Sequence, residues 1–390
     1  MCARQQRDFL AFLAGIVVIV DTSPASMPEI NHPGQRLLSL DFFRGAIMVL
    51  LALEACGFYE AMRDATGGWF WMQFFHHPWN GLRFWDLIQP GFMFIAGTSM
   101  AFSLTRQWSQ GRTWNQSFTR MLKRCGWLFF WGVLNYAVGR DGLSFELWNV
   151  LTQLSFTLLV AFLVFNWSFY NQLAFSIGLL LLTEVLYRYT NIPGFDQPFT
   201  DQHNFGNYMD LVLMDKINRG GWVAINCIPT AAHTIWGALA GKLLMRPTDA
   251  SLKTTTLLGF GLAGLAIGYG MDWTITPIIK KIATSSFTIA SGGWCLLALA
   301  LCYWWIDVRD HRKYLKFFTI VGMNPIFIYL FFEIVGHRWF NGYVGAITNG
   351  LMEMVHMPEN LMLIITALVI FALEWGLCYF LYKKRIFFKL

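Results

Sequence analysis

Two histidines in an aromatic loop are the side chains best suited to chemistry in this sequence. His76 and His77 stand four and three residues before Asn80, and Asp86 follows ten residues after His76. A neutral imidazole can act as a general base or as a nucleophile, and either role needs a partner that fixes the ring's tautomer. Asp86, Asn80 and Glu54 are the candidate partners of His76, and the sequence leaves open which of them orients the ring.

The same loop also fits a structural role. The aromatic side chains between residues 69 and 79 are typical of a membrane-interface belt, which the histidines would then only anchor. Asp86 also lies three residues after Arg83 on one predicted helix face, a spacing that suits a structural ion pair. Both alternatives stay open at this point.

Composition identifies the class of protein that must position these residues. The chain has 390 residues, of which 56% are hydrophobic and only 13% are charged, and long apolar runs recur along its whole length. This pattern is typical of a polytopic membrane protein. The net charge of +6 comes from loop lysines and arginines, so we do not expect nucleic-acid binding. The seven cysteines include no CxxC pair, and we expect no metal site.

Ten apolar stretches of about 20 residues, the length that a bilayer demands, predict an all-α bundle of about ten transmembrane helices. If the chain crosses the membrane at each stretch, 20 of the 29 Lys and Arg residues fall on one side. The positive-inside rule then predicts that both termini are cytoplasmic and that the His76 loop faces out. The stretches lie near residues 41–61, 83–105, 120–139, 147–167, 170–188, 222–245, 254–270, 286–306, 316–337 and 360–383.

The chain divides most simply into an N-terminal extension and one membrane domain. Phe9–Val20 is an apolar run of 12 residues, too short to span comfortably, and it follows two arginines as in a signal peptide. We interpret residues 1–35 as a dispensable extension or a membrane-surface segment. Residues 36–390 are expected to form a single transmembrane domain in a cell inner (plasma) membrane.

Small residues and basic residues add two further expectations. Gly97 with Ala101, and Gly237 with Gly241, are four residues apart and predict close helix contacts. A separate basic group suits the phosphates of a nucleotide-bearing donor at a cytoplasmic mouth, although positive-inside anchoring explains any single member as well. That group consists of Arg44, Arg120, Lys123 and Arg124.

Five motifs in order resemble the heparan-α-glucosaminide N-acetyltransferase family of transmembrane acyltransferases. The resemblance covers residues 36–390. The motifs are SLDFFRG at 39–45, H-x-P-W-N-G-x4-D-L at 76–87, Ser285-Ser286-Phe287 with Gly292-Gly293 and Ile306-Asp307, Gly322-Met323-Asn324 with Tyr329 and Glu333, and the basic-aromatic tail at 382–389.

The resemblance implies an activity and a set of roles. In the family an acyl group passes from cytosolic acetyl-CoA to an amino sugar on the far side of the membrane, and the family's active histidine maps onto His76. Trp79, Asn324 and Glu333, which lie in these motifs, are the expected acceptor contacts. The chain departs from the family at Glu54-Ala55, where human-type members carry Asn, and at Leu151-Thr152-Gln153, where the family's Arg is missing.

Two classes of function are therefore held open. The first is a membrane acyltransferase that uses acetyl-CoA and acts on an extracytoplasmic sugar or glycan through His76, as base or as acyl carrier. The second is a transporter or flippase of glycan or lipid intermediates, which ten spans, Pro- and Gly-broken helices and buried acids would also suit. The bilayer is the expected partner in both cases, and a homodimer is left open.

The predicted topology can be tested by cysteine labelling in intact cells. Ser109→Cys, in the 106–119 loop, should react with a membrane-impermeant thiol reagent only after permeabilisation, because that loop belongs to the basic, cytoplasmic side. Asp196→Cys, in the 189–221 loop, serves as the outward control and should react without permeabilisation. Labelling of Ser109→Cys in intact cells would reverse the assignment.

Overall fold

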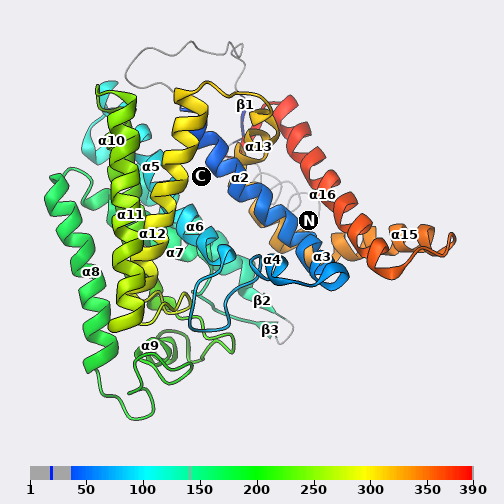
Figure 1. Cartoon of the computed structure of the whole chain (residues 1–390), viewed down its shortest axis with the longest axis horizontal. Helices are drawn as coiled ribbons and strands as arrows, with labels where there is room; N and C mark the ends of the chain where they lie inside the picture. Colours follow the sequence, from blue (N-terminus) through cyan, green and yellow to red (C-terminus); the bar gives the residue numbers. More distant parts are fainter. Residues whose placement is uncertain (1–17, 21–36, 140–141, 389–390) are drawn as a thin grey trace, which may run out of the picture. The chain divides into compact units, whose positions relative to one another are not determined.

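The computed structural model describes residues 18–20, 37–139 and 142–388, and these ranges are almost entirely helical (Figure 1). The all-α prediction is confirmed. The helices are α2 (Leu38–Ala55), α3 (Phe58–Thr66), α4 (Trp69–Met72), η1 (Phe84–Leu87), α5 (Ile88–Ser109), α6 (Trp114–Ala137), α7 (Val150–Leu163), α8 (Phe169–Tyr189), α9 (Phe205–Met214), η2 (Ala224–Asn226), α10 (Cys227–Met245), α11 (Ala250–Thr274), α12 (Ser285–Cys302), η3 (Tyr303–Val308), α13 (Leu315–Gly322), α14 (Pro325–Leu330), η4 (Phe331–Phe340), α15 (Asn341–Glu353) and α16 (Glu359–Lys383).

Short antiparallel strand pairs complete the described ranges. Val18–Val20 (β1) pairs with Ile386–Phe388 (β4), and Val138–Gly139 (β2) pairs with Gly142–Leu143 (β3). The rest of the predicted N-terminal extension, residues 1–17 and 21–35, lies outside the described residues, so its interpretation stays a prediction.

Several helices have the length and apolar character of membrane spans. Among the described residues five helices meet both conditions, and seven do so if each of two bent helix pairs counts as one span. The bent pairs are α2 with α3, at 64°, and α13 with the helix that follows it from Pro325, at 74°. The chain is therefore a multi-pass membrane protein. The prediction of ten spans includes α6, α7 and α10, which are shorter or more polar, and it stays a prediction.

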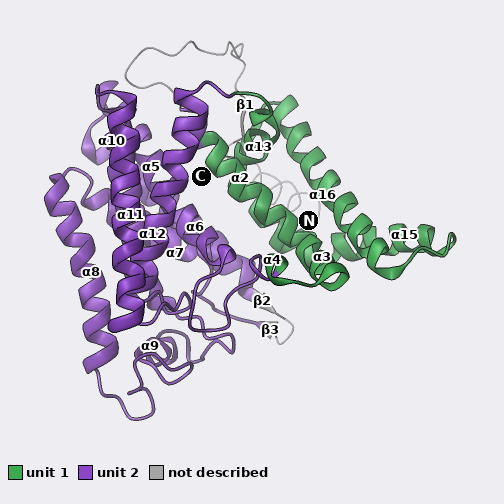
Figure 2. Ribbon diagram, in the orientation of Figure 1, with its two compact units in different colours: residues 1–31, 41–71, 312–390 green, residues 32–40, 72–311 purple. Residues whose placement is uncertain are grey.

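The chain separates into two compact units, each built from distant parts of the sequence (Figure 2). Unit 1 comprises the described parts of residues 1–31, 41–71 and 312–390. Unit 2 comprises the described parts of residues 32–40 and 72–311, and it contains the His76 loop.

Glycines bring α5 and α10 of unit 2 into backbone contact. A Cβ added at Gly97 would lie 2.0 Å from the carbonyl oxygen of Thr234, and one added at Gly237 would lie 2.0 Å from the carbonyl oxygen of Phe94. Gly241 meets Ala101 in the same way, at 2.8 Å. The close contact predicted from the small residues is confirmed, with α10 as the partner of α5. Because η1 and α5 follow the His76 loop directly, this contact fixes the helix that carries Asp86.

The α11 and α12 helices of unit 2 pack through a second set of small residues, and they lie side by side in Figure 1. A Cβ at Gly268 would lie 2.6 Å from the backbone nitrogen of Ala290, and one at Gly264 would lie 3.1 Å from the Cα of Gly293. This pair therefore holds the N-terminus of α12, which begins at Ser285 just after the loop that joins the two helices.

Unit 1 has its own close contact and its own polar anchor. A Cβ at Gly45 on α2 would lie 2.2 Å from the carbonyl oxygen of Phe318 on α13. The buried side chain of Asn324 donates from Nδ2 to the carbonyl of Ile386 (2.9 Å), and its Oδ1 accepts from the backbone nitrogen of Phe388 (2.9 Å). These contacts fix the basic-aromatic tail, so the local role of Asn324 is to hold β4.

The α5–α10 contact can be tested with a pair of glycine variants. Gly97→Ala should lower the melting temperature of the detergent-solubilised protein by several degrees, because overpacking costs about 1–3 kcal/mol. Gly178→Ala on α8 is the matched control, since nothing lies within 4 Å of its added Cβ. Both variants gain helix propensity equally, so equal melting temperatures would show that the backbones can separate at no cost.

Candidate active site

The imidazole of His76 is bonded to a buried carboxylate. Its Nδ1 lies 2.9 Å from Oδ1 of Asp86, a fully buried residue of η1. About two fifths of the His76 side chain, 42%, stays accessible. Of the three candidate partners, Asp86 is the one that contacts the ring. Because Nδ1 is engaged, Nε2 is the nitrogen left for a reacting molecule, and within the described part of the chain it has no hydrogen-bond partner.

The second oxygen of Asp86 holds the loop's backbone. Oδ2 accepts from the backbone nitrogens of His77 (3.2 Å) and Arg83 (2.9 Å). The guanidinium of Arg83 instead donates to the carbonyl oxygen of His76, at 3.0 Å. The structural pair proposed for Asp86 and Arg83 is thus a capping arrangement through the backbone of Arg83. One carboxylate thereby closes the loop and orients the ring.

One aromatic neighbour, Trp222, and one cationic neighbour, Lys280, complete the surroundings of the His76 ring. Trp222 meets His76 edge to face, with ring centroids 5.4 Å apart. Partial burial, followed in size by the charge of Lys280, lowers the pKa of His76, while the contacts with Asp86 raise it. The net shift is downward, which favours the neutral imidazole, the form that can accept a proton or an acyl group.

Lys280 is the site residue that the sequence analysis missed. Its Nζ lies 3.0 Å from Nδ1 of His76 and 3.7 Å from Oδ1 of Asp86, and only 6% of the residue is accessible. One signal could have found it. Lys280 and Lys281 lie on the side of the predicted topology that is otherwise poor in basic residues, and a cation there needs a local reason.

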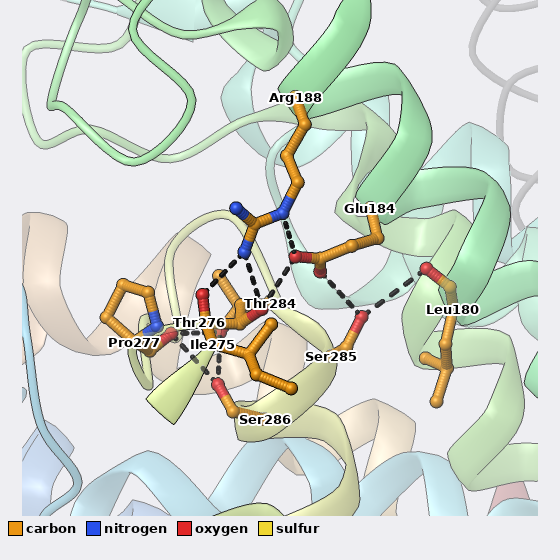
Figure 3. Close-up of polar contacts among 9 residues, drawn as sticks. All are labelled: Leu180, Glu184, Arg188, Ile275, Thr276, Pro277, Thr284, Ser285 and Ser286. Atoms are coloured by element: carbon orange, nitrogen blue, oxygen red, sulfur yellow. Dashed lines mark hydrogen bonds and ion pairs between the residues drawn. The ribbon is translucent and has the colours of Figure 1, made fainter. Parts of the chain in front are cut away.

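A polar network on α8 anchors the segment that carries Lys280 (Figure 3). Glu184 accepts from Arg188 and Thr276, each at 2.6 Å, and from the hydroxyl of Ser285, at 3.0 Å. Arg188 also donates to the carbonyl oxygen of Ile275, at 2.6 Å. The network thus ties both ends of the 275–286 segment to α8.

The same segment pairs directly with the loop after His76. Asn80 forms an isolated antiparallel bridge with Ile279, and the backbone nitrogen of Gly81 donates to the carbonyl of Ile278, at 2.8 Å. Gly81 has a φ of 132°, and a Cβ there would lie 2.7 Å from Nε2 of His77. The ring of His77 is therefore packed on Gly81, whereas His76 faces Lys280. Asn80 contributes its backbone to this pairing.

The other predicted site residues are distributed over both units. Trp79 donates from its indole to the carbonyl oxygen of Phe199 (2.7 Å), and the ammonium of Lys281 lies 5.7 Å from its ring centroid. Glu54 lies one residue before the end of α2, in unit 1. Glu333 lies in the π-helix η4, also in unit 1. Their predicted roles stay predictions.

The basic residues predicted to bind the acyl donor also belong to different units. Arg120, Lys123 and Arg124 share the N-terminal half of α6 in unit 2, where Arg120 and Lys123 are exposed. Arg120 donates to the side-chain oxygen of Gln107, at 3.4 Å. Arg44 belongs to unit 1, where its guanidinium lies 3.8 Å from Oδ1 of Asp41. The three α6 residues therefore form one basic helix face.

Fold and site define a multi-pass, all-α membrane protein in which a loop presents a histidine–aspartate pair. No family model matches the sequence. The chain is 24% identical to the heparan-alpha-glucosaminide N-acetyltransferase of Homo sapiens over an alignment 446 residues long. The alignment covers 95% of this chain and 62% of that protein. The Mus musculus protein of the same name is 24% identical over 419 residues, covering 91% and 60%.

These comparisons show a distant relationship to that family of N-acetyltransferases, as the motifs indicated. The chain spans about three fifths of the length of the curated relatives that it matches.

The role of Asp86 in closing the loop can be measured by hydrogen exchange. In Asp86→Asn the carboxylate becomes a neutral amide, so whichever way the amide turns, the backbone nitrogens of His77 and Arg83 lose their charged acceptor. Hydrogen bonds to a charged acceptor are worth about 1.5–3 kcal/mol, so the amides of residues 77–83 should exchange roughly tenfold faster or more. Asp64→Asn, which alters an exposed carboxylate bonded to Arg63, is the control. Unchanged exchange in Asp86→Asn would mean that other contacts close the loop.

Proposed function

We propose that this protein is a membrane acyltransferase that moves an acetyl group from cytoplasmic acetyl-CoA to an extracytoplasmic amino sugar or glycan through His76. The observation that carries the proposal is the His76–Asp86 contact, which leaves Nε2 open on an accessible ring face. The distant relationship to N-acetyltransferases supports the choice of an acyl-transfer reaction.

The geometry suits general base catalysis. An acceptor amine attacks the thioester carbonyl carbon while Nε2 of His76 takes the amine proton. The carbon–sulfur bond then breaks, and the thiolate leaves as free CoA once it has gained a proton. Asp86 holds Nδ1–H in place and stabilises the imidazolium that forms, which is the usual role of a carboxylate behind a histidine.

The same atoms suit a two-step route through the imidazole. Nε2 attacks the thioester carbonyl, the thiolate leaves, and an acetyl-imidazole forms on His76. The acceptor amine then attacks this acetyl group, and neutral imidazole is regenerated after a proton is lost. Acyl-imidazoles are reactive acyl donors, so this route divides one difficult step into two easier ones.

The donor would enter from the basic side of the membrane. We place the CoA phosphates near Arg44, Arg120, Lys123 and Arg124, since each charge-assisted phosphate contact contributes roughly 1.5–3 kcal/mol. This placement uses the predicted topology of ten helices with both termini in the cytoplasm. The pantetheine arm would then carry the acetyl group toward the outward-facing His76 loop.

The acceptor and the location follow from the same topology. Trp79, Asn324 and Glu333 are the proposed acceptor contacts, in a multi-pass protein of the cell inner (plasma) membrane. The name of the human relative states that it acetylates the amino group of a glucosaminide. An amino sugar is therefore the class of acceptor that we propose, and a homodimer is a compatible assembly.

A pair of histidine variants tests the proposal. His76→Ala should abolish transfer from radiolabelled acetyl-CoA to an amino-sugar acceptor, since it removes Nε2, while CoA binding measured by calorimetry stays within about twofold. His77→Ala is the matched neighbour and should keep most of the activity, because its ring packs on Gly81. Full transfer by His76→Ala would reject the mechanism, and equal losses in the two variants would indicate a structural loop.

A further inference from the structure

Lys280 contacts both His76 and Asp86, but it has no part in the proposed acetyl transfer. We propose that Lys280 is a positioning residue that keeps His76 unprotonated, an inference that rests on the proposed function of His76. Three observations carry it: the 3.0 Å contact of Nζ with Nδ1, the 3.7 Å contact with Asp86, and the burial of Lys280.

Asp86 and Lys280 compete for the same ring nitrogen, Nδ1 of His76. Nδ1 of a neutral imidazole either carries a proton and donates, or carries a lone pair and accepts. If it donates to Asp86, Nε2 has the free lone pair that base or nucleophilic chemistry needs. If it accepts from the ammonium of Lys280, the proton moves to Nε2 and blocks that chemistry. Nζ lies nearer to Nδ1 (3.0 Å) than to Oδ1 of Asp86 (3.7 Å), so Lys280 competes with Asp86 for Nδ1. In either tautomer its charge opposes the gain of a second proton by the ring.

The charges around the ring determine how easily it gains a second proton. Among the described residues Asp86, on η1, is the carboxylate that acts on His76, whereas Lys280 and Lys281 approach from the 275–286 segment. Arg83, on the loop itself, binds the carbonyl oxygen of His76. The ammonium of Lys280 is the largest charge effect opposing protonation, which agrees with its direct contact.

The fold holds Lys280 in this position from several directions. The carbonyl oxygen of Lys280 accepts from the backbone nitrogen of Ala283, at 2.9 Å, and the preceding residue, Ile279, bridges to Asn80. The ammonium also lies 5.2 Å from the ring centroid of Trp222, the same aromatic that meets His76. The network of Glu184 then ties the segment to α8 (Figure 3). A long, flexible side chain is thereby confined beside Nδ1.

Diethyl pyrocarbonate provides a direct test, because it modifies an imidazole only at an unprotonated nitrogen. The extent of modification of His76 is measured by mass spectrometry across pH in the intact, detergent-solubilised protein, with neither donor nor acceptor present. In Lys280→Met the midpoint should rise by about one pH unit, since removal of a neighbouring cation makes protonation about tenfold easier. Lys280→Arg keeps a cation and should stay near the wild-type midpoint.

Lys281→Met is the matched control, because its ammonium lies against Trp79 and is a smaller influence on His76. An unchanged or lower midpoint in Lys280→Met would overturn the proposal, as would equal shifts in the two methionine variants. If Lys280→Met does not fold, Lys280→Gln is the second neutral replacement. Its midpoint should rise in the same way, and an unchanged or lower midpoint would overturn the proposal.

The readout separates this inference from the proposed function. A raised midpoint in Lys280→Met without any acetyl transfer by the wild-type protein would retain the role of Lys280 and reject the acyltransferase. If transfer occurs, the acidic limb of its kcat/KM profile should move upward in Lys280→Met by the same amount. An acidic limb that does not move would contradict the proposal even if activity falls.

Discussion

The Asp86 carboxylate is buried near the start of a membrane helix, where it needs hydrogen-bond donors. The structure around His76 depends on which groups supply them. Ionised groups away from water are costly unless they are paired and hydrogen-bonded. Asp86 receives two backbone nitrogens, the ring nitrogen of His76 and the ammonium of Lys280. Satisfying this one charge therefore brings the loop, the imidazole and the 275–286 segment together.

Close backbone contact is one means by which the helices of the supporting scaffold hold together. Gly97 and Gly237 let α5 and α10 approach until carbonyl oxygens occupy the space of absent side chains. Apolar side chains gain little from leaving lipid for a helix interface, so such packing supplies much of the specificity between membrane helices. Near the C-terminal end of α8, the polar side chains of Glu184 and Arg188 fix the segment that carries Lys280. The rigid helices thus present a loop whose side chains are individually restrained.

Local patterns in the sequence predicted the all-α class, the helix contact at Gly97 and the choice of His76 with Asp86 as candidates. Each depends on spacing within one or two helices, which sequence reports directly. Lys280 could not be derived in this way, because it lies some two hundred residues from His76 and meets it only through the return of the chain after α11. The amide of Asn324 holds β4, a role visible only once the tail is placed, and its predicted contact with an acceptor stays a prediction.

The most direct test of the account is a structure of the protein with acetyl-CoA bound. We expect the thioester carbonyl carbon within about 3–3.5 Å of Nε2 of His76, or of an amine held beside it, as near-attack geometry requires. The Nδ1–Asp86 contact should persist in that complex. A thioester bound far from His76, with Nε2 facing empty solvent, would contradict the assignment of His76 as the group that handles the acyl transfer.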